Sequence, residues 1–220
     1  MPGGRPRGFD PQAALDRALE LFRRQGYEGT SLTDLTAAMG INRNSLYATY
    51  GNKEQLFRQA LDRYAAGPGA FAAEAPAEPT ARAVVARMLR GAVELTCGEH
   101  APPGCLSVNA VHACGPESAP VRAEVVARRA AGEGVLRDRF ARAPDLPPGY
   151  DPATLARLVH TLTDGIAVQA ASGHDREQLL QVAELALRAL FPAGPPEVAG
   201  RSPEEAGPRA AGRPRALPEG

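Results

Sequence analysis

The chain of 220 residues has no tryptophan, few aromatic residues, one lysine and three cysteines. An odd number of cysteines without framework spacing argues against a secreted disulfide scaffold. Long apolar runs are also missing, and the first ten residues, MPGGRPRGFD, lack the apolar segment of a signal peptide. We therefore expect a cytoplasmic protein without a membrane partner.

Net charge is absent as well, because 25 basic residues balance 25 acidic residues. Residues 1–64 hold nine basic and seven acidic side chains, and residues 65–192 hold twelve and fourteen. The broad basic field of many nucleic-acid-binding proteins is therefore missing. Any binding of nucleic acid has to rest on a few placed side chains.

Strand signals are scarce, since the sequence contains neither a long alternating run nor an Asn-Gly hairpin turn. Segment 65–79 has no clear period and is predicted to be a bent connection, and residues 193–220, rich in proline and glycine, are predicted to be a disordered tail. Elsewhere the spacing of apolar residues predicts helices at about 11–25, 31–39, 42–50, 52–64, 80–97, 105–113, 118–142, 152–172 and 175–191.

Several predicted helices begin at a recognisable cap. Asp10-Pro11 and Asp151-Pro152 combine a capping side chain with a first-turn proline. Thr30 or Ser31 caps the second helix, and Asn42 and Asn52 cap the third and fourth. The second and third helices, joined by a short turn with glycine, form a helix-turn-helix, which places its second helix in the DNA major groove.

The stretch FDPQAALDRALELFRRQGYEGTSLTDLTAAMGINRNSLYATYGNKEQLF, residues 9–57, resembles the DNA-binding region of the tetracycline-repressor (TetR) family. Its skeleton, F…GY-TS-DL…GI…SLY--Y--KE-LF, is long and free of gaps. The rest of the chain resembles the family in architecture only, as a larger all-helical domain.

The resemblance implies an all-α protein with an N-terminal arm and a three-helix helix-turn-helix DNA-binding head (1–64) and a larger helical ligand-binding and dimerisation domain (65–192). It further implies a homodimer formed through the last two long helices. Such a regulator represses transcription at a pseudo-palindromic operator of double-stranded DNA until an unidentified small-molecule inducer binds.

The lone lysine, Lys53, falls in the first turn of a predicted helix, where the helix dipole disfavours a cation. A DNA phosphate at that helix start would receive the ammonium and the free backbone N–H groups. The resemblance gives Lys53 and Tyr47 this phosphate-binding role. The alternative for every candidate is an ordinary surface side chain. The other predicted DNA contacts are Arg5 and Arg7 in the minor groove or on phosphate, Thr30, Ser31 and Thr33 on phosphates, and Arg43, Asn44, Ser45 and Thr49 on bases.

Cys97, His100, Cys105, His112 and Cys114 lie within eighteen residues. A zinc or copper site is one interpretation, but the stretch has no CxxC pair and free cysteines are commonly buried apolar groups. We predict no metal site. The segment GCL at 104–106 is similar to a branch of the family in which a cysteine near this point responds to electrophiles or oxidants. Such a thiol needs a lowered pKa and access.

The inducer site is predicted from polar and sulfur-bearing residues of the larger domain: Met88, Cys105, Asn109, His112, His160 and Asp164. A core or dimer-interface role for His160 and Asp164 is equally open. No enzymatic activity is predicted, because no nucleophile-elbow pattern surrounds Ser107. No cofactor is predicted either, and the sequence has no phosphate-cradling glycine loop of the common types. Two alternatives stay open: a thiol- or metal-based stress sensor using Cys105 on the same head, and a helical adaptor that binds no DNA.

Overall fold

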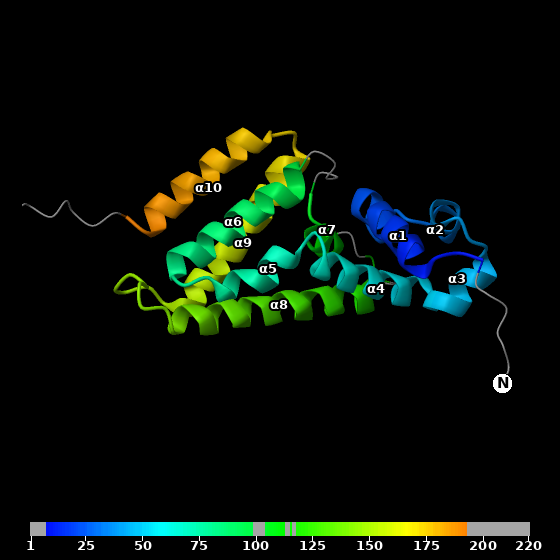
Figure 1. Ribbon diagram of the computed structural model, residues 1–220, viewed down its shortest axis with the longest axis horizontal. Helices are drawn as coiled ribbons and strands as arrows, with labels where there is room; N and C mark the ends of the chain where they lie inside the picture. Colours follow the sequence, from blue (N-terminus) through cyan, green and yellow to red (C-terminus); the bar gives the residue numbers. More distant parts are fainter. Residues whose placement is uncertain (1–7, 99–103, 113–114, 116–117, 193–220) are drawn as a thin grey trace, which may run out of the picture.

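The computed structural model describes residues 8–98, 104–112, 115 and 118–192, and within these ranges every regular element is a helix. The predicted all-α class is thereby confirmed (Figure 1). The elements are α1 (Pro11–Gln25), α2 (Leu32–Met39), α3 (Arg43–Tyr50), α4 (Lys53–Ala66), α5 (Ala70–Glu74), the 3-10 turn η1 (Ala75–Ala77), α6 (Ala81–Cys97), α7 (Leu106–His112), α8 (Ala119–Ala141), α9 (Pro152–Ala171) and α10 (Arg176–Leu190).

Local capping fixes the helix starts near the N-terminus. Asp10 accepts a hydrogen bond from the Gln12 N–H at 2.8 Å, and Asn42 accepts one from the Ser45 N–H at 2.8 Å. Capping boxes open α2 and α4, so the predicted boundaries are confirmed. Gly40 ends α2 at φ 68°, a left-handed conformation that glycine adopts without strain, and this turn sets the angle between α2 and α3.

The connection between the fourth and sixth helices contains more structure than the sequence indicated. Residues 65–79 were predicted to be a bent connection, but α5 and η1 both lie within this stretch. Alanine favours a helix without producing an apolar period, which is why the pattern gave no signal. Phe71 of α5 packs on Gly91 of α6, where a β-carbon would overlap the phenyl ring.

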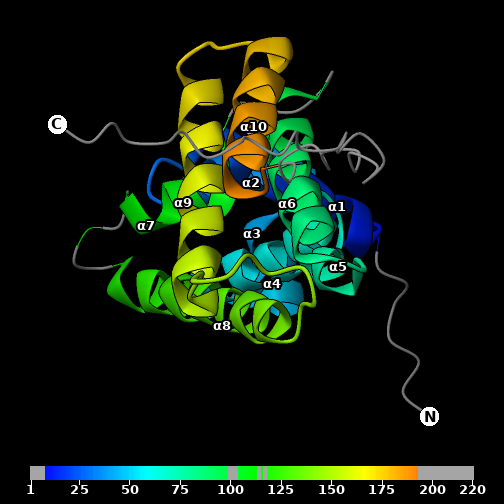
Figure 2. The same ribbon diagram turned by 90° about the vertical axis from the view of Figure 1, so that its left-hand side faces the viewer.

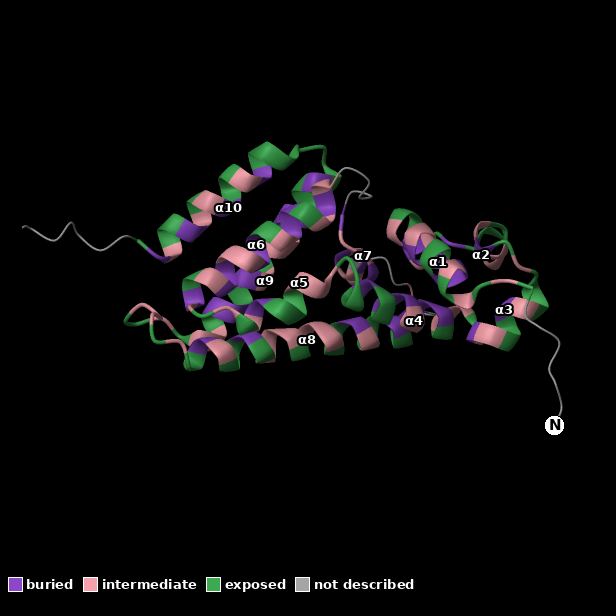
Figure 3. Ribbon diagram, in the orientation of Figure 1, coloured by how far each residue is buried: buried purple, intermediate pink, exposed green. Residues whose placement is uncertain are grey.

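The buried residues, coloured purple in Figure 3, form two clusters. One lies between α6, α9, α10 and the C-terminal part of α8. The other joins α1–α4 to α7 and to the N-terminal part of α8, and its centre holds Phe22 and Phe57 with their rings edge to face at 5.0 Å. The helix-turn-helix region therefore shares its core with residues far along the chain.

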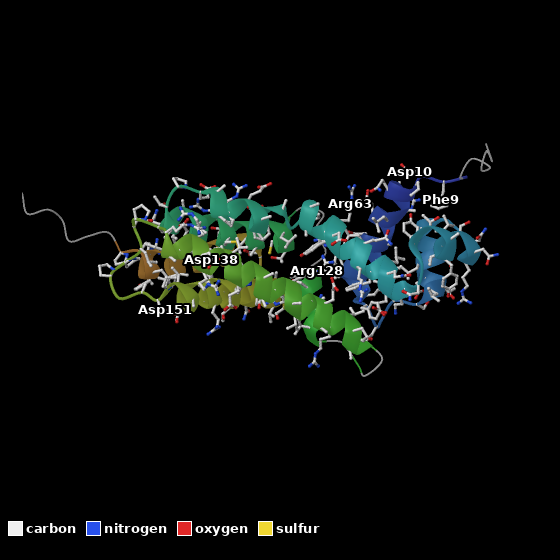
Figure 4. All side chains as sticks on the ribbon, turned by 90° about the horizontal axis from the view of Figure 1, so that it is seen from below. Phe9, Asp10, Arg63, Arg128, Asp138 and Asp151 are labelled. Atoms are coloured by element: carbon white, nitrogen blue, oxygen red, sulfur yellow. The ribbon has the colours of Figure 1, made fainter. Side chains whose placement is uncertain are left out.

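Helix α8 connects the two clusters. Val121 and Val125 near its start belong to the cluster around Phe22 and Phe57. Leu136 and Phe140 near its end belong to the cluster between α6, α9 and α10. Arg128, between these pairs, bonds Asp62 of α4 at 2.5 Å, and the α4–α8 contact is seen from below in Figure 4. The 23 residues of α8 span about 35 Å at 1.5 Å per residue, so a single continuous helix connects the two buried clusters.

None of the helices in the described ranges combines the length and apolar character that a membrane span requires.

Candidate DNA interface and ligand cavity

Helix α3 presents a polar face to solvent at one end of the molecule (Figure 1). Arg43 and Asn44 at its start are exposed, and Tyr47 one turn later is 46% exposed, while Leu46 on the opposite side is completely buried. Tyr50 is also buried and donates its hydroxyl to the Pro11 carbonyl at 2.7 Å. The helix is thus anchored by its inner face and offers its outer face to a partner.

Ser45 and Thr49 are only partly exposed. Both line a hollow of about 390 Å³ beside the start of α3, together with Gly8 and Phe9 at the beginning of the described chain. Arg5 and Arg7 precede this point and lie outside the described residues. The hollow therefore lies between the first described residues and α3.

Lys53 is the first residue of α4 and lies half-buried against the ring of Tyr27. Its Nζ is 4.4 Å from the ring centroid, a cation–π contact. Burial lowers the pKa of Lys53, and the negative charge of Glu28 opposes that change. The sequence pattern did not reveal either partner, and both help to hold a cation at a helix start that would otherwise disfavour it.

Of the three candidates around the start of α2, one is buried and two are exposed. Thr30 was predicted to contact phosphate, but its side chain is completely buried and its hydroxyl donates to the Gly26 carbonyl at 2.6 Å. Thr30 therefore closes the turn after α1. Ser31 caps α2 through the Asp34 N–H at 3.1 Å and is exposed, as is Thr33 in the first turn of α2.

A cavity of about 240 Å³ lies between α4, α5, α6, α8 and α9. Four of the six predicted ligand residues line it: Met88, Cys105, His160 and Asp164. Asn109 does not line the cavity, and its amide lies beside Gly104. The side chain of His112 lies outside the described part of the structure. The volume is below that usual for drug-sized ligands and suits a small molecule.

The polar end of this cavity is formed by α8 and α9. Arg129 pairs with Asp164, and His160 lies beside Gly132. Burial, and after it the positive charge of Arg129, lowers the pKa of His160, although Asp164 and Glu133 act in the opposite sense. A pKa below its ordinary 6.5 leaves the imidazole neutral at pH 7, so this end offers a neutral hydrogen-bonding ring beside an ion pair.

At the other end, the Cys105 thiol lies between two hydroxyl groups. The Tyr64 hydroxyl donates to its Sγ at 3.3 Å, and the Ser107 Oγ is 3.1 Å away. Burial, together with the neighbouring thiol, raises the pKa of Tyr64, so its hydroxyl remains a donor. Sequence reasoning missed Tyr64 as a cavity residue, since it lies 41 residues from Cys105 and no local pattern joins them.

The cysteine and histidine cluster is only partly visible. Cys97 and Cys105 are both partly exposed free thiols, whereas His100 and Cys114 lie outside the described residues. Within the described part of the chain, no three histidine, cysteine, aspartate or glutamate side chains gather as metal ligands.

Helices α2 and α3 are joined by a short turn, and the outer face of α3 is exposed. This arrangement defines a helix-turn-helix DNA-binding protein. Residues 14–60 match the family described as bacterial regulatory proteins, tetR family. The transcriptional repressor ComR of Escherichia coli K12 is 35% identical over 198 residues, which cover 86% of this chain and 92% of ComR. The repressor BdcR of the same strain is 27% identical over 189 residues, covering 85% and 92%.

Among solved structures, a cysteine mutant of the TetR-family regulator CifR, in complex with a 26-base-pair operator DNA, superimposes with a TM-score of 0.80. It shares 41% sequence identity, and the match covers 85% of this chain and all of the CifR chain. The protein belongs to the TetR family and is a DNA-binding transcriptional regulator.

Proposed function

We propose that the protein is a repressor that binds a pseudo-palindromic operator as a homodimer and leaves it when a small molecule enters the cavity at Cys105. The observation that carries the proposal is the exposed face of α3, with Arg43, Asn44 and Tyr47 unobstructed in the single chain. The relatives ComR and BdcR are repressors by name. Residues 1–64 act in this proposal as the DNA-binding head and residues 65–192 as the ligand-binding and dimerising part.

The proposed DNA contacts follow the exposed side of the head. Arg43 and Asn44, with Ser45 and Thr49, lie against base edges, because guanidinium and amide groups match guanine and adenine in the major groove. Tyr47 and Lys53 hold phosphates on one side of the groove, and Ser31 and Thr33 hold them on the other. Arg5 and Arg7, outside the described residues, are proposed for the minor groove.

The proposed dimer interface is an apolar face on α9 and α10, consecutive helices whose connecting loop lies at the top of Figure 2. On α9 the exposed residues Leu158, Thr161, Gly165 and Val168 recur at helical spacing. A β-carbon at Gly165 would meet no neighbour within the chain, which leaves room for a second helix to approach closely. On α10, Val182 and Leu185 are exposed one turn apart. Such unpartnered apolar stripes are typical of helices that pack against another subunit.

Replacing Lys53 by glutamine tests the DNA-binding part of the proposal. The DNA probe is the duplex that the wild-type chain selects from a random-sequence pool, and its affinity is measured by fluorescence anisotropy at several salt concentrations. Because a homodimer loses two phosphate contacts, the slope of log affinity against log salt should become shallower by about two. At 0.15 M salt the affinity should fall by about tenfold.

The matched control is Arg24→Gln, which removes an exposed cation from the end of α1, away from α3, where it pairs with Glu20. It should leave the slope unchanged. Equal slopes for Lys53→Gln and the control would remove Lys53 from the interface. Failure of the wild-type chain to select any duplex would favour the adaptor alternative.

The position of Cys105 favours a second, compatible function, a response to thiol-reactive molecules. Its sulfur lines the cavity and is held by Tyr64 and Ser107. The related CifR was solved on operator DNA with three cysteines substituted. In this proposal a covalent adduct on Cys105 takes the place of a reversibly bound inducer.

Thiomethylation tests this response in a Cys97→Ser/Cys114→Ser background. The Cys105 thiolate attacks methyl methanethiosulfonate, giving a methyl disulfide on Cys105 and releasing methanesulfinate. Operator affinity should fall by at least about tenfold, within the usual range of allosteric coupling, and recover after dithiothreitol. Cys105→Ser in the same background should show no change on treatment. An unaltered affinity after complete modification, verified by mass spectrometry, would exclude the thiol response.

A further inference from the structure

Arg23 is a largely buried cation in the last turn of α1, next to the helix-turn-helix. Its side chain is only 10% exposed, and its Nε is buried without a hydrogen-bond partner among the described residues. Its nearest carboxylate, Glu20, is 3.8 Å from the guanidinium. A charge removed from water depends on its remaining contacts, so those contacts constrain where α1 can lie.

One of these contacts reaches across to α6. The Arg23 Nη2 donates to the Leu95 carbonyl at 3.3 Å, in the last turn of α6. Carbonyl groups at a helix C-terminus lack partners within the helix and carry the negative end of its dipole, so a guanidinium is well placed there. Leu95 also lines the ligand cavity, whereas Arg23 lines a separate hollow on the other side of Leu95.

The other contact reaches toward Cys105. The guanidinium carbon of Arg23 lies 5.7 Å from the ring centroid of Tyr64, and the hydroxyl at the far end of that ring donates to the Cys105 sulfur. Tyr64 is itself buried, so its ring has little free space in which to move. Because the Tyr64 hydroxyl lies 3.3 Å from the Cys105 sulfur, a group added to that sulfur would crowd the ring that supports Arg23.

We propose that Arg23 is the positioning residue that couples the state of Cys105 to the DNA-binding helices, through Tyr64 on one side and the Leu95 carbonyl on the other. The inference rests on the proposed thiol response. When the Tyr64 ring moves, the guanidinium loses its cation–π contact and its bond to α6 weakens. Helix α1, and with it the packed α2–α3 unit, is then released from the orientation that fits the operator.

The experiment measures the operator affinity before complete thiomethylation of Cys105 divided by the affinity after it, in the Cys97→Ser/Cys114→Ser background. With Arg23 present the ratio should be at least about tenfold. Arg23→Gln removes both guanidinium contacts, so its reduced form should already bind the selected operator about as weakly as the modified parent, and its ratio should fall below about twofold. Arg23→Lys keeps the cation but not the planar fork, so its ratio should be intermediate.

Arg24→Gln, the neighbouring exposed arginine, is the matched control and should keep the full ratio. A merely structural role for Arg23 would lower stability and affinity in both states without changing the ratio. If Arg23→Gln unfolds, Arg23→Lys and Tyr64→Phe decide, since Tyr64→Phe keeps the ring and removes only the hydroxyl link to sulfur. If these variants keep a ratio of about tenfold, the coupling role of Arg23 is overturned while the thiol response stands. If the parent with Arg23 intact shows no loss of affinity on thiomethylation, both the thiol response and the coupling are overturned.

Discussion

Alanine at both Arg43 and Asn44 is expected to weaken binding to the selected operator by at least about 100-fold, while binding to an unrelated duplex persists. Both side chains are exposed at the start of α3. A good bidentate base contact contributes about 1–3 kcal/mol of discrimination, and a homodimer loses each contact twice. The phosphate contacts proposed for Tyr47 and Lys53 stay in place, so the nonspecific, salt-dependent binding should remain. Anisotropy titrations with both duplexes measure the two effects.

The control for this double substitution is Arg24→Ala/Gln25→Ala, which also removes one guanidinium and one amide. These residues are exposed at the end of α1, outside α3. The control should retain both specific and nonspecific affinity. If the Arg43/Asn44 variant still bound the operator within about threefold of the wild type, sequence reading would have to be assigned to other residues.

Glutamate at both Val182 and Leu185 is expected to convert a dimer into monomers and to reduce operator affinity by at least about 100-fold. Val182 is 50% and Leu185 63% exposed in the single chain, so the substitutions should be tolerated within the fold. In the proposed interface, however, they would bury four carboxylates across the two subunits without partners, which is strongly unfavourable. A monomer also contacts only half of a pseudo-palindromic site.

Sedimentation equilibrium measures the subunit state, and circular dichroism confirms that the helices remain. A matched control places the same charges on α8, at Val126 and Val135, which are comparably exposed apolar residues outside the proposed interface. The control should remain dimeric. A monomeric wild type, or a dimer that survives both glutamates on α10, would contradict the proposed interface.

The helix-turn-helix region was predictable because its determinants are local. Asp10, Ser31, Asn42 and Asn52 each bond to a backbone N–H two or three residues later, and such bonds depend only on short-range sequence. The inward position of Leu46 likewise follows from its spacing in α3. Local chemistry was insufficient for Thr30: serine and threonine at a helix start are both capable of capping or contacting phosphate, and only the fold shows that Thr30 is buried.

The cavity was only partly predictable, because its walls come from distant segments. Chemical type identified Cys105 and His160, but the pairing of Tyr64 with Cys105 is a tertiary contact with no sequence period. The same limit applies to Lys53. Its unusual position indicated a compensating partner, but the Tyr27 ring, 26 residues earlier in the sequence, became identifiable only from packing.

The continuity of α8 through both buried clusters has a consequence for how the molecule can be divided. If the first 64 residues were expressed alone, Leu106, Val121 and Val125 would be missing from the cluster around Phe22 and Phe57, and the surface they normally cover would face water. We therefore expect the isolated DNA-binding head to be less stable and less soluble than the 220-residue chain.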